Sequence, residues 1–150
     1  MGICVLEKEG YEADDIMGTA AKICEELGWE CDVVTGDKVS FQLITDTSHV
    51  IHIKSRMGQT ETIDYSTEVF WEEYGFAPPY IVDLKALMGD KSDNIPGVAG
   101  VGEKSALNLL EKYTDLDGIY GHLDEITGAL NKKLTEGKEN AYFSKELATI

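Results

Sequence analysis

The chain has 150 residues, with 28 Asp and Glu against 13 Lys and Arg, which gives a formal net charge of −15. An apolar content of 43% indicates a globular core and excludes a disordered chain, and the length fits one domain or one and part of a second. Three cysteines without C-x-x-C spacing give neither a disulfide framework nor a zinc pattern, and no apolar run approaches a membrane span. We therefore expect a cytoplasmic protein. Its net negative charge should repel nucleic acid, so that binding would depend on local basic clusters or bound metal ions.

The first 63 residues alternate helical and extended patterns. After a short apolar lead-in, a helix begins near Tyr11 and ends at Gly28. Its apolar stripe, which we expect to be buried, consists of Ile16, Ala20, Ile23 and Leu27. Strands are predicted at 30–35, 49–53 and 61–63, with a short helix or turn at 39–44 and a polar turn at 54–60. Residues 1–63 thus predict a small, partial α/β layer.

Residues 64–150 read as an all-α half. Ser66 can cap a helix that ends at Gly75, and Pro78-Pro79 introduces the next helix. Further helices are predicted at 103–113, 116–123, 130–134 and 141–147. We expect the two halves to form one compact unit.

The stretch from Met88 to Leu110 combines two chemistries. Asp90 and Asp93 come first, and a glycine-rich turn from Gly97 to Gly102 then opens into an amphipathic helix. Glycines let the backbone approach a ligand, and a helix N-terminus presents free N–H groups to a phosphate. An apolar run with helical spacing precedes the turn. The pattern over residues 81–112, approximately, therefore predicts a helix-hairpin-helix motif, which binds the backbone of a nucleic acid.

Acidic residues gather at three places, and each place has an ordinary structural explanation as well as a functional one. Glu12, Asp14 and Asp15 start a helix, where acids complement the helix dipole and cap N–H groups. Asp37 follows a buried strand, where ligands bind in open α/β sheets, but turn aspartates are common. Asp90 and Asp93 could share a ligand or cap the turn.

The combination of carboxylates points to one chemistry. Phosphodiester hydrolysis by two metal ions needs several oxygen ligands around ions about 4 Å apart. Carboxylates suit Mg²⁺ or Mn²⁺. The sequence therefore favours a metal-dependent nuclease.

Three strings carry a family resemblance: Y-E-A-D-D at 11–15, V-T-G-D-K at 34–38 and G-D-K-S-D-N-I-P-G-V-A-G-V-G at 89–102. They resemble the structure-specific 5′ nucleases, above all the 5′→3′ exonuclease (flap endonuclease-like) domain of bacterial DNA polymerase I. The resemblance implies a PIN-like sheet layer, a helix–three-turn–helix motif and hydrolysis at the 5′ ends of nicked or branched duplex DNA. It also implies a polymerase domain in the same parent chain, Mg²⁺ or Mn²⁺, and K⁺ at the hairpin.

The same resemblance assigns residues to roles. The implied catalytic residues are Asp14, Asp15, Asp37, Asp90 and Asp93, and Glu12 joins them in one metal cluster. The implied DNA-binding residues are Gly97, Val98, Gly100, Val101, Gly102 and Lys104, with the last four at the K⁺ and phosphate positions.

Two departures from the family pattern bear on activity. The family motif after the strand is usually G-D-K-D, whereas this chain has Val39 in place of the second aspartate. Relatives also carry, before Y-E-A-D-D, a segment with a first-strand aspartate and a basic helical arch. We expect the fold to survive and cleavage to be impaired. The alternatives are a DNA-binding module that uses only the hairpin, and a folded remnant that binds neither DNA nor metal.

Overall fold

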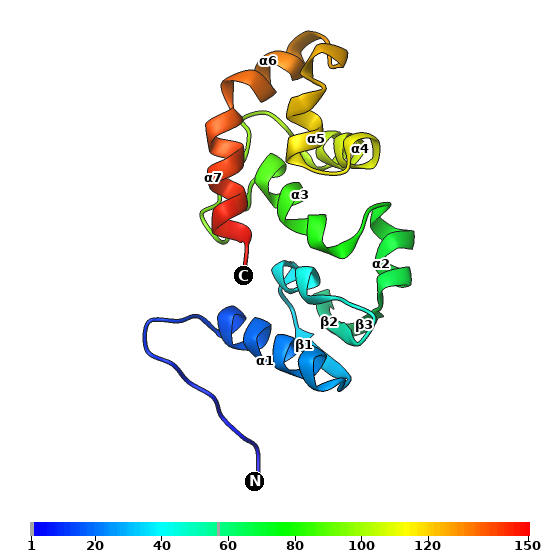
Figure 1. Ribbon diagram of the computed structural model, residues 1–150, viewed down its shortest axis with the longest axis vertical. Coiled ribbons are helices and arrows are strands. Elements are labelled where there is room, and N and C mark those ends of the chain that lie inside the picture. The colour runs from blue at the N-terminus through cyan, green and yellow to red at the C-terminus, as the bar shows by residue number, and fades with distance from the viewer. Residues whose placement is uncertain (1, 57) are drawn as a thin grey trace. The chain divides into compact units, whose positions relative to one another are not determined.

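The computed structural model describes residues 2–56 and 58–150, which divide into two compact units (Figure 1). The first unit runs to Val69 and includes Ile150, and the second runs from Phe70 to Thr149. The described helices include none that is long and apolar enough to cross a membrane.

The first unit is a three-stranded sheet with one α-helix and one 3₁₀ helix. Its elements are α1 (Ala13–Leu27), β1 (Cys31–Thr35), η1 (Lys38–Leu43), β2 (Ser48–Arg56) and β3 (Gln59–Tyr65). The strand order is β1-β2-β3, with β1 parallel to β2, β2 antiparallel to β3, and β1 at one edge of the sheet. The register aligns Val33, Val50 and Tyr65 in one buried row. Phe41 from η1 packs on this row, with its ring centroid 4.6 Å from that of Tyr65.

The second unit is helical. It contains most of α2 (Thr67–Tyr74), then η2 (Pro78–Tyr80), α3 (Ile81–Met88), α4 (Glu103–Tyr113), α5 (Leu116–Gly121), η3 (Leu123–Glu125), α6 (Gly128–Glu136) and α7 (Lys138–Ala148). Helix α3 lies between α4 and α7, and every residue from Ile81 to Leu87 is buried (Figure 1).

Two charged side chains lie inside this buried helix, and one of them links three helices. The Asp83 carboxylate on α3 accepts a hydrogen bond from the Leu116 N–H at 3.1 Å and pairs with Lys145 Nζ at 2.8 Å. Burial raises the pKa of this carboxyl from its ordinary value despite both partners. Through these two contacts, Asp83 holds the first residue of α5 and the Lys145 side chain of α7 against α3.

The predicted α/β layer followed by a helical half is confirmed, as are the three strands and the helix ends at Gly28 and Gly75. The predicted polar turn at 54–60 is wrong, because β2 continues to Arg56 and β3 begins at Gln59. The buried stripe on α1 is also wrong. Ala21 is the buried residue of this helix, whereas Ile23 is 49% and Leu27 55% exposed. Periodicity identified the apolar face of the helix but not whether anything covers it.

Candidate metal and nucleic-acid site

The acidic residues at the start of α1 form a helix cap. The Glu12 N–H donates to Asp15 Oδ2 at 3.0 Å, and the Glu12 side chain accepts from the Asp15 N–H, which makes a reciprocal capping box. Asp14 and Asp15 lie in the first turn, where their charges favour the positive end of the helix dipole. The structural explanation foreseen for these residues is therefore present in the fold.

Asp37 also has a local structural role. Its Oδ1 accepts from the Val39 N–H at 2.8 Å and caps η1, and its own N–H donates to Thr35 Oγ1 at 3.1 Å. Val39 is 7% exposed, so the position where the family pattern has a second aspartate contributes an apolar side chain to the core of the first unit.

Asp90 and Asp93 converge on one cation in the second unit. Lys85 Nζ lies 2.8 Å from Asp90 Oδ2 and 3.3 Å from Asp93 Oδ2. The chain turns back through paired backbone hydrogen bonds between Asp90 and Ile95, of 2.9 and 2.8 Å, which direct both carboxylates toward α3. The Lys85 ammonium and the Ser92 hydroxyl and N–H hold the pKa of Asp90 at about 2. The site therefore places two carboxylates around one ammonium group.

The Lys85 ammonium occupies the position between Asp90 and Asp93 that a bound metal ion would take. Two carboxylate oxygens from different residues approach a single positive centre, as the oxygen ligands of Mg²⁺ or Mn²⁺ do. In the part of the chain described, however, no three His, Cys, Asp or Glu side chains are grouped to hold a metal ion. Asp90 and Asp93 fit as part of a ligand set, and the six-carboxylate cluster stays a prediction because its members lie in separate units.

The glycine-rich turn is anchored from within the second unit. Val98 and Val101 are buried, and the Val98 N–H donates to the Leu87 carbonyl at 2.8 Å. Gly97 has φ +63°, and a Cβ built on it would lie 2.3 Å from the Gly89 nitrogen, so this close backbone approach requires glycine. The buried Ser144 hydroxyl accepts from the Gly97 N–H at 2.9 Å. This packing leaves the two valine side chains in the core, where only their backbone groups can serve a ligand.

The exposed part of the turn leads into α4. Gly100, Gly102 and Lys104 are exposed, and Gly102 is the N-cap residue of α4. The free N–H groups of this helix start face outward, which suits a phosphate. Lys133 on α6 donates from its Nζ to the Gly100 carbonyl at 2.9 Å, so an ammonium lies against one of the oxygens implied for K⁺.

Two lysines at these sites were missed by the sequence analysis. Lys85 lies five residues before Asp90 in a mostly apolar run that Asp83 also interrupts, and a cation inside such a run was a detectable signal. Lys133 lies on α6, and nothing in the local sequence pattern indicates its contact with the turn 33 residues earlier.

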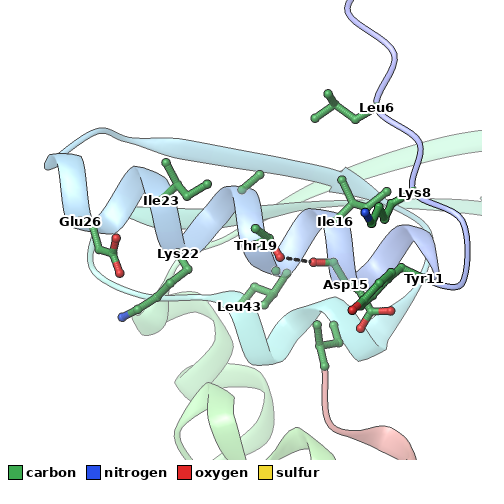
Figure 2. Close-up of a pocket in the computed structure, with 13 residues that line it drawn as sticks. Leu6, Lys8, Tyr11, Asp15, Ile16, Thr19, Lys22, Ile23, Glu26 and Leu43 are labelled. Carbon is green, nitrogen blue, oxygen red and sulfur yellow. Dashed lines mark hydrogen bonds between the residues drawn. The ribbon is translucent and has the colours of Figure 1, made fainter.

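A groove of about 890 Å³ runs along α1 in the first unit (Figure 2). Its lining mixes apolar residues, among them Ile16, Ile23 and Leu43, with the charged side chains of Asp15 and Lys22. Figure 2 shows Tyr11 beside Asp15 near the start of the helix, with Lys22 and Glu26 further along it. The groove lies over the apolar stripe that the sequence analysis expected to be buried.

Comparison with known proteins gives matches over both halves. Residues 1–75 match the family described as 5′-3′ exonuclease, N-terminal resolvase-like domain, and residues 76–150 match 5′-3′ exonuclease, C-terminal SAM fold. DNA polymerase I of Bacillus subtilis is 49% identical over 145 residues, which is 96% of this chain and 16% of that protein. The thermostable DNA polymerase I of Thermus aquaticus is 37% identical over 150 residues, which is 100% of this chain and 17% of that protein. The chain thus spans about one sixth of the length of these relatives.

Solved structures match the fold. A T5 5′-exonuclease with bound zinc superposes with a TM-score of 0.77 at 24% identity, over 95% of this chain and 51% of that one. A complex of the bacteriophage T5 flap endonuclease with DNA and metal ions gives the same TM-score, identity and coverage.

Proposed function

The chain belongs to the 5′-3′ exonuclease family, and on that basis we propose that it works as part of a metal-dependent nuclease acting on DNA. Its reaction is hydrolysis of phosphodiesters near the 5′ end of a nicked or flapped duplex. The observation that carries the proposal is the convergence of Asp90 and Asp93 on one cation. The T5 enzyme solved with DNA and metal ions, which shares this fold, supports the same substrate class.

In the proposed site, Asp90 and Asp93 supply oxygen ligands from the second unit. Glu12, Asp14, Asp15 and Asp37 supply the remainder from the first unit. A bound Mg²⁺ or Mn²⁺ ion would lower the pKa of a coordinated water and stabilise charge on the leaving oxygen. A metal ligand must be ionised, and the Asp90 carboxyl, with a pKa of about 2, is ionised at neutral pH.

The turn and α4 hold the duplex in this proposal. The exposed N-terminus of α4, with Gly102 at its cap and Lys104 in its first turn, receives a phosphate. Carbonyl groups of Gly100, Val101 and Gly102 are the candidates for a K⁺ ion. Because the net charge is −15, contacts to phosphates act against the overall field, and DNA affinity falls steeply with salt. The polymerase identity of the relatives supports a polymerase domain in the same parent chain.

A cleavage assay tests the proposal. The purified chain is incubated with a labelled 5′-flap duplex and Mn²⁺, and the products are resolved on a denaturing gel. We expect cleavage near the flap junction that is lost in Asp90→Ala and kept in Asp124→Ala, which removes an exposed carboxylate from η3.

The outcomes separate the competing functions. Cleavage that survives in Asp90→Ala would contradict the assignment of Asp90. Retardation of the duplex by the unmodified chain without any cleavage would leave the DNA-binding module as the function.

A further inference from the structure

Lys85 has an unusual position for a lysine. It lies in the middle of α3, its side chain is 10% exposed, and its neighbours on the helix are the buried Leu84 and Ala86. A buried ammonium without a counter-ion is costly, and here the counter-ions are the two proposed metal ligands, Asp90 and Asp93. The fold thus places an ammonium group inside the proposed metal site.

The individual oxygen atoms show what this charge does. Asp90 Oδ1 accepts hydrogen bonds from the N–H and hydroxyl of Ser92, while Asp90 Oδ2 accepts from Lys85. Asp93 also offers its Oδ2 atom to Lys85. A divalent ion that bound Asp90 through Oδ2 would have to displace the ammonium from that atom, since Oδ1 of Asp90 already accepts two hydrogen bonds from Ser92.

We propose that Lys85 is a positioning residue that holds the carboxylates of Asp90 and Asp93 together before metal binds, and that its ammonium competes with the divalent ion for their Oδ2 atoms. The inference rests on the proposed metal-binding role of these two aspartates. Without a cation between them, two neighbouring carboxylates repel each other. Lys85 therefore stabilises the metal-free fold and at the same time weakens metal binding.

These two effects give Lys85 a signature that a merely structural lysine lacks. Lys85→Met keeps the length of the side chain and removes its charge. We expect a lower melting temperature without metal, a Mn²⁺ dissociation constant lower on the order of tenfold, and a larger rise in melting temperature on adding Mn²⁺. Lys85→Arg keeps the charge, and its Mn²⁺ affinity should stay near that of the unmodified chain.

Lys145→Met is the matched control. It also removes a lysine that pairs with an aspartate at 2.8 Å in the second unit, but its partner is Asp83 rather than a proposed ligand. We expect this variant to lose thermal stability and to bind Mn²⁺ with unchanged affinity. Isothermal titration calorimetry with Mn²⁺ and thermal melts with and without Mn²⁺ measure all the variants.

The outcomes are distinguishable. If the unmodified chain binds no Mn²⁺, the proposed metal site and this inference both fail. If it binds Mn²⁺ and Lys85→Met binds equally or more weakly, only the role of Lys85 fails.

A second measurement does not depend on whether the variants fold. The Lys85 ammonium signal in the ¹⁵N spectrum of the unmodified chain is followed during a Mg²⁺ titration. We expect it to shift as Mg²⁺ replaces the ammonium, and a signal that stays fixed at saturation would overturn the proposal.

Discussion

The two units differ in how completely they bury their apolar side chains. Among the described residues, seven buried apolar residues lie in the first unit and twenty in the second. Ten of the fourteen exposed large apolar side chains belong to the first unit, including Ile23 and Leu27 on α1. Packing therefore constrains Asp90 and Asp93 through the buried helix α3, whereas Asp15 lies on a helix with one face open along the groove. The comparison shows that the carboxylates of one proposed site lie on elements that are buried to different extents.

The largest expected difference in stability between the two units comes from replacing one glycine in each. Gly97 and Gly28 both have positive φ, but a Cβ meets the Gly89 nitrogen at 2.3 Å in the first case and nothing within 4 Å in the second. We expect Gly97→Ala to lower the free energy of unfolding of the second unit by more than roughly 4 kcal/mol. Gly28→Ala should cost the first unit about 1 kcal/mol, since only the left-handed backbone is strained. Amide hydrogen exchange reports each unit separately, and equal losses would break the comparison.

The next largest difference in stability is expected between alanine substitutions of two leucines, one in each unit. Leu110 on α4 is 1% exposed, whereas Leu27 on α1 is 55% exposed. Leu110→Ala should destabilise the second unit by about 3 kcal/mol, because it removes buried methyl groups and leaves a cavity. Leu27→Ala should change stability by less than about 0.5 kcal/mol. Chemical denaturation followed by circular dichroism measures both, and a large loss for Leu27→Ala would show that its helix face is covered in solution.

The smallest effect is a pH dependence confined to the second unit. Burial raises the pKa of Asp83, so the folded state favours the protonated carboxyl relative to the unfolded chain. Its stabilising contribution is fully present below its ordinary pKa of 3.8 and is lost as pH rises through the raised value. The stability difference between the unmodified chain and Asp83→Asn should therefore decline from pH 3 to pH 6. Denaturation midpoints across this range measure it, and a difference that grows with pH would reverse the assignment.

Local chemistry accounts for the features that the sequence predicted well. Helix α4 was predicted with its observed bounds, because Gly102 precedes an amphipathic run and Tyr113 is followed by a break. The left-handed Gly28 ends α1, and the capping role of Asp15 was foreseen as an alternative. These features depend on residues within one turn of each other.

Features that depend on distant residues were not predictable in the same way. The approach of Lys85 to Asp90 requires the backbone pairing of Asp90 with Ile95, and the exposure of Ile23 depends on whether another element lies over α1. A single sequence gives the apolar face of a helix and the charge of a side chain, but not their tertiary neighbours. Asp15 and Asp37 lie in the first unit and Asp90 in the second, so their joining in one cluster is a proposal.

Within the part of the chain that the structure describes, strand β1 has one strand neighbour, β2, and its outer edge offers main-chain donors and acceptors to a further strand. Self-association through this edge would bring together copies that each carry a net charge of −15. Added salt screens that repulsion, with a screening length of about 8 Å at 0.15 M. Added salt is therefore expected to act in opposite directions on this protein, because it would weaken the proposed contacts to DNA phosphates and also screen the repulsion between copies.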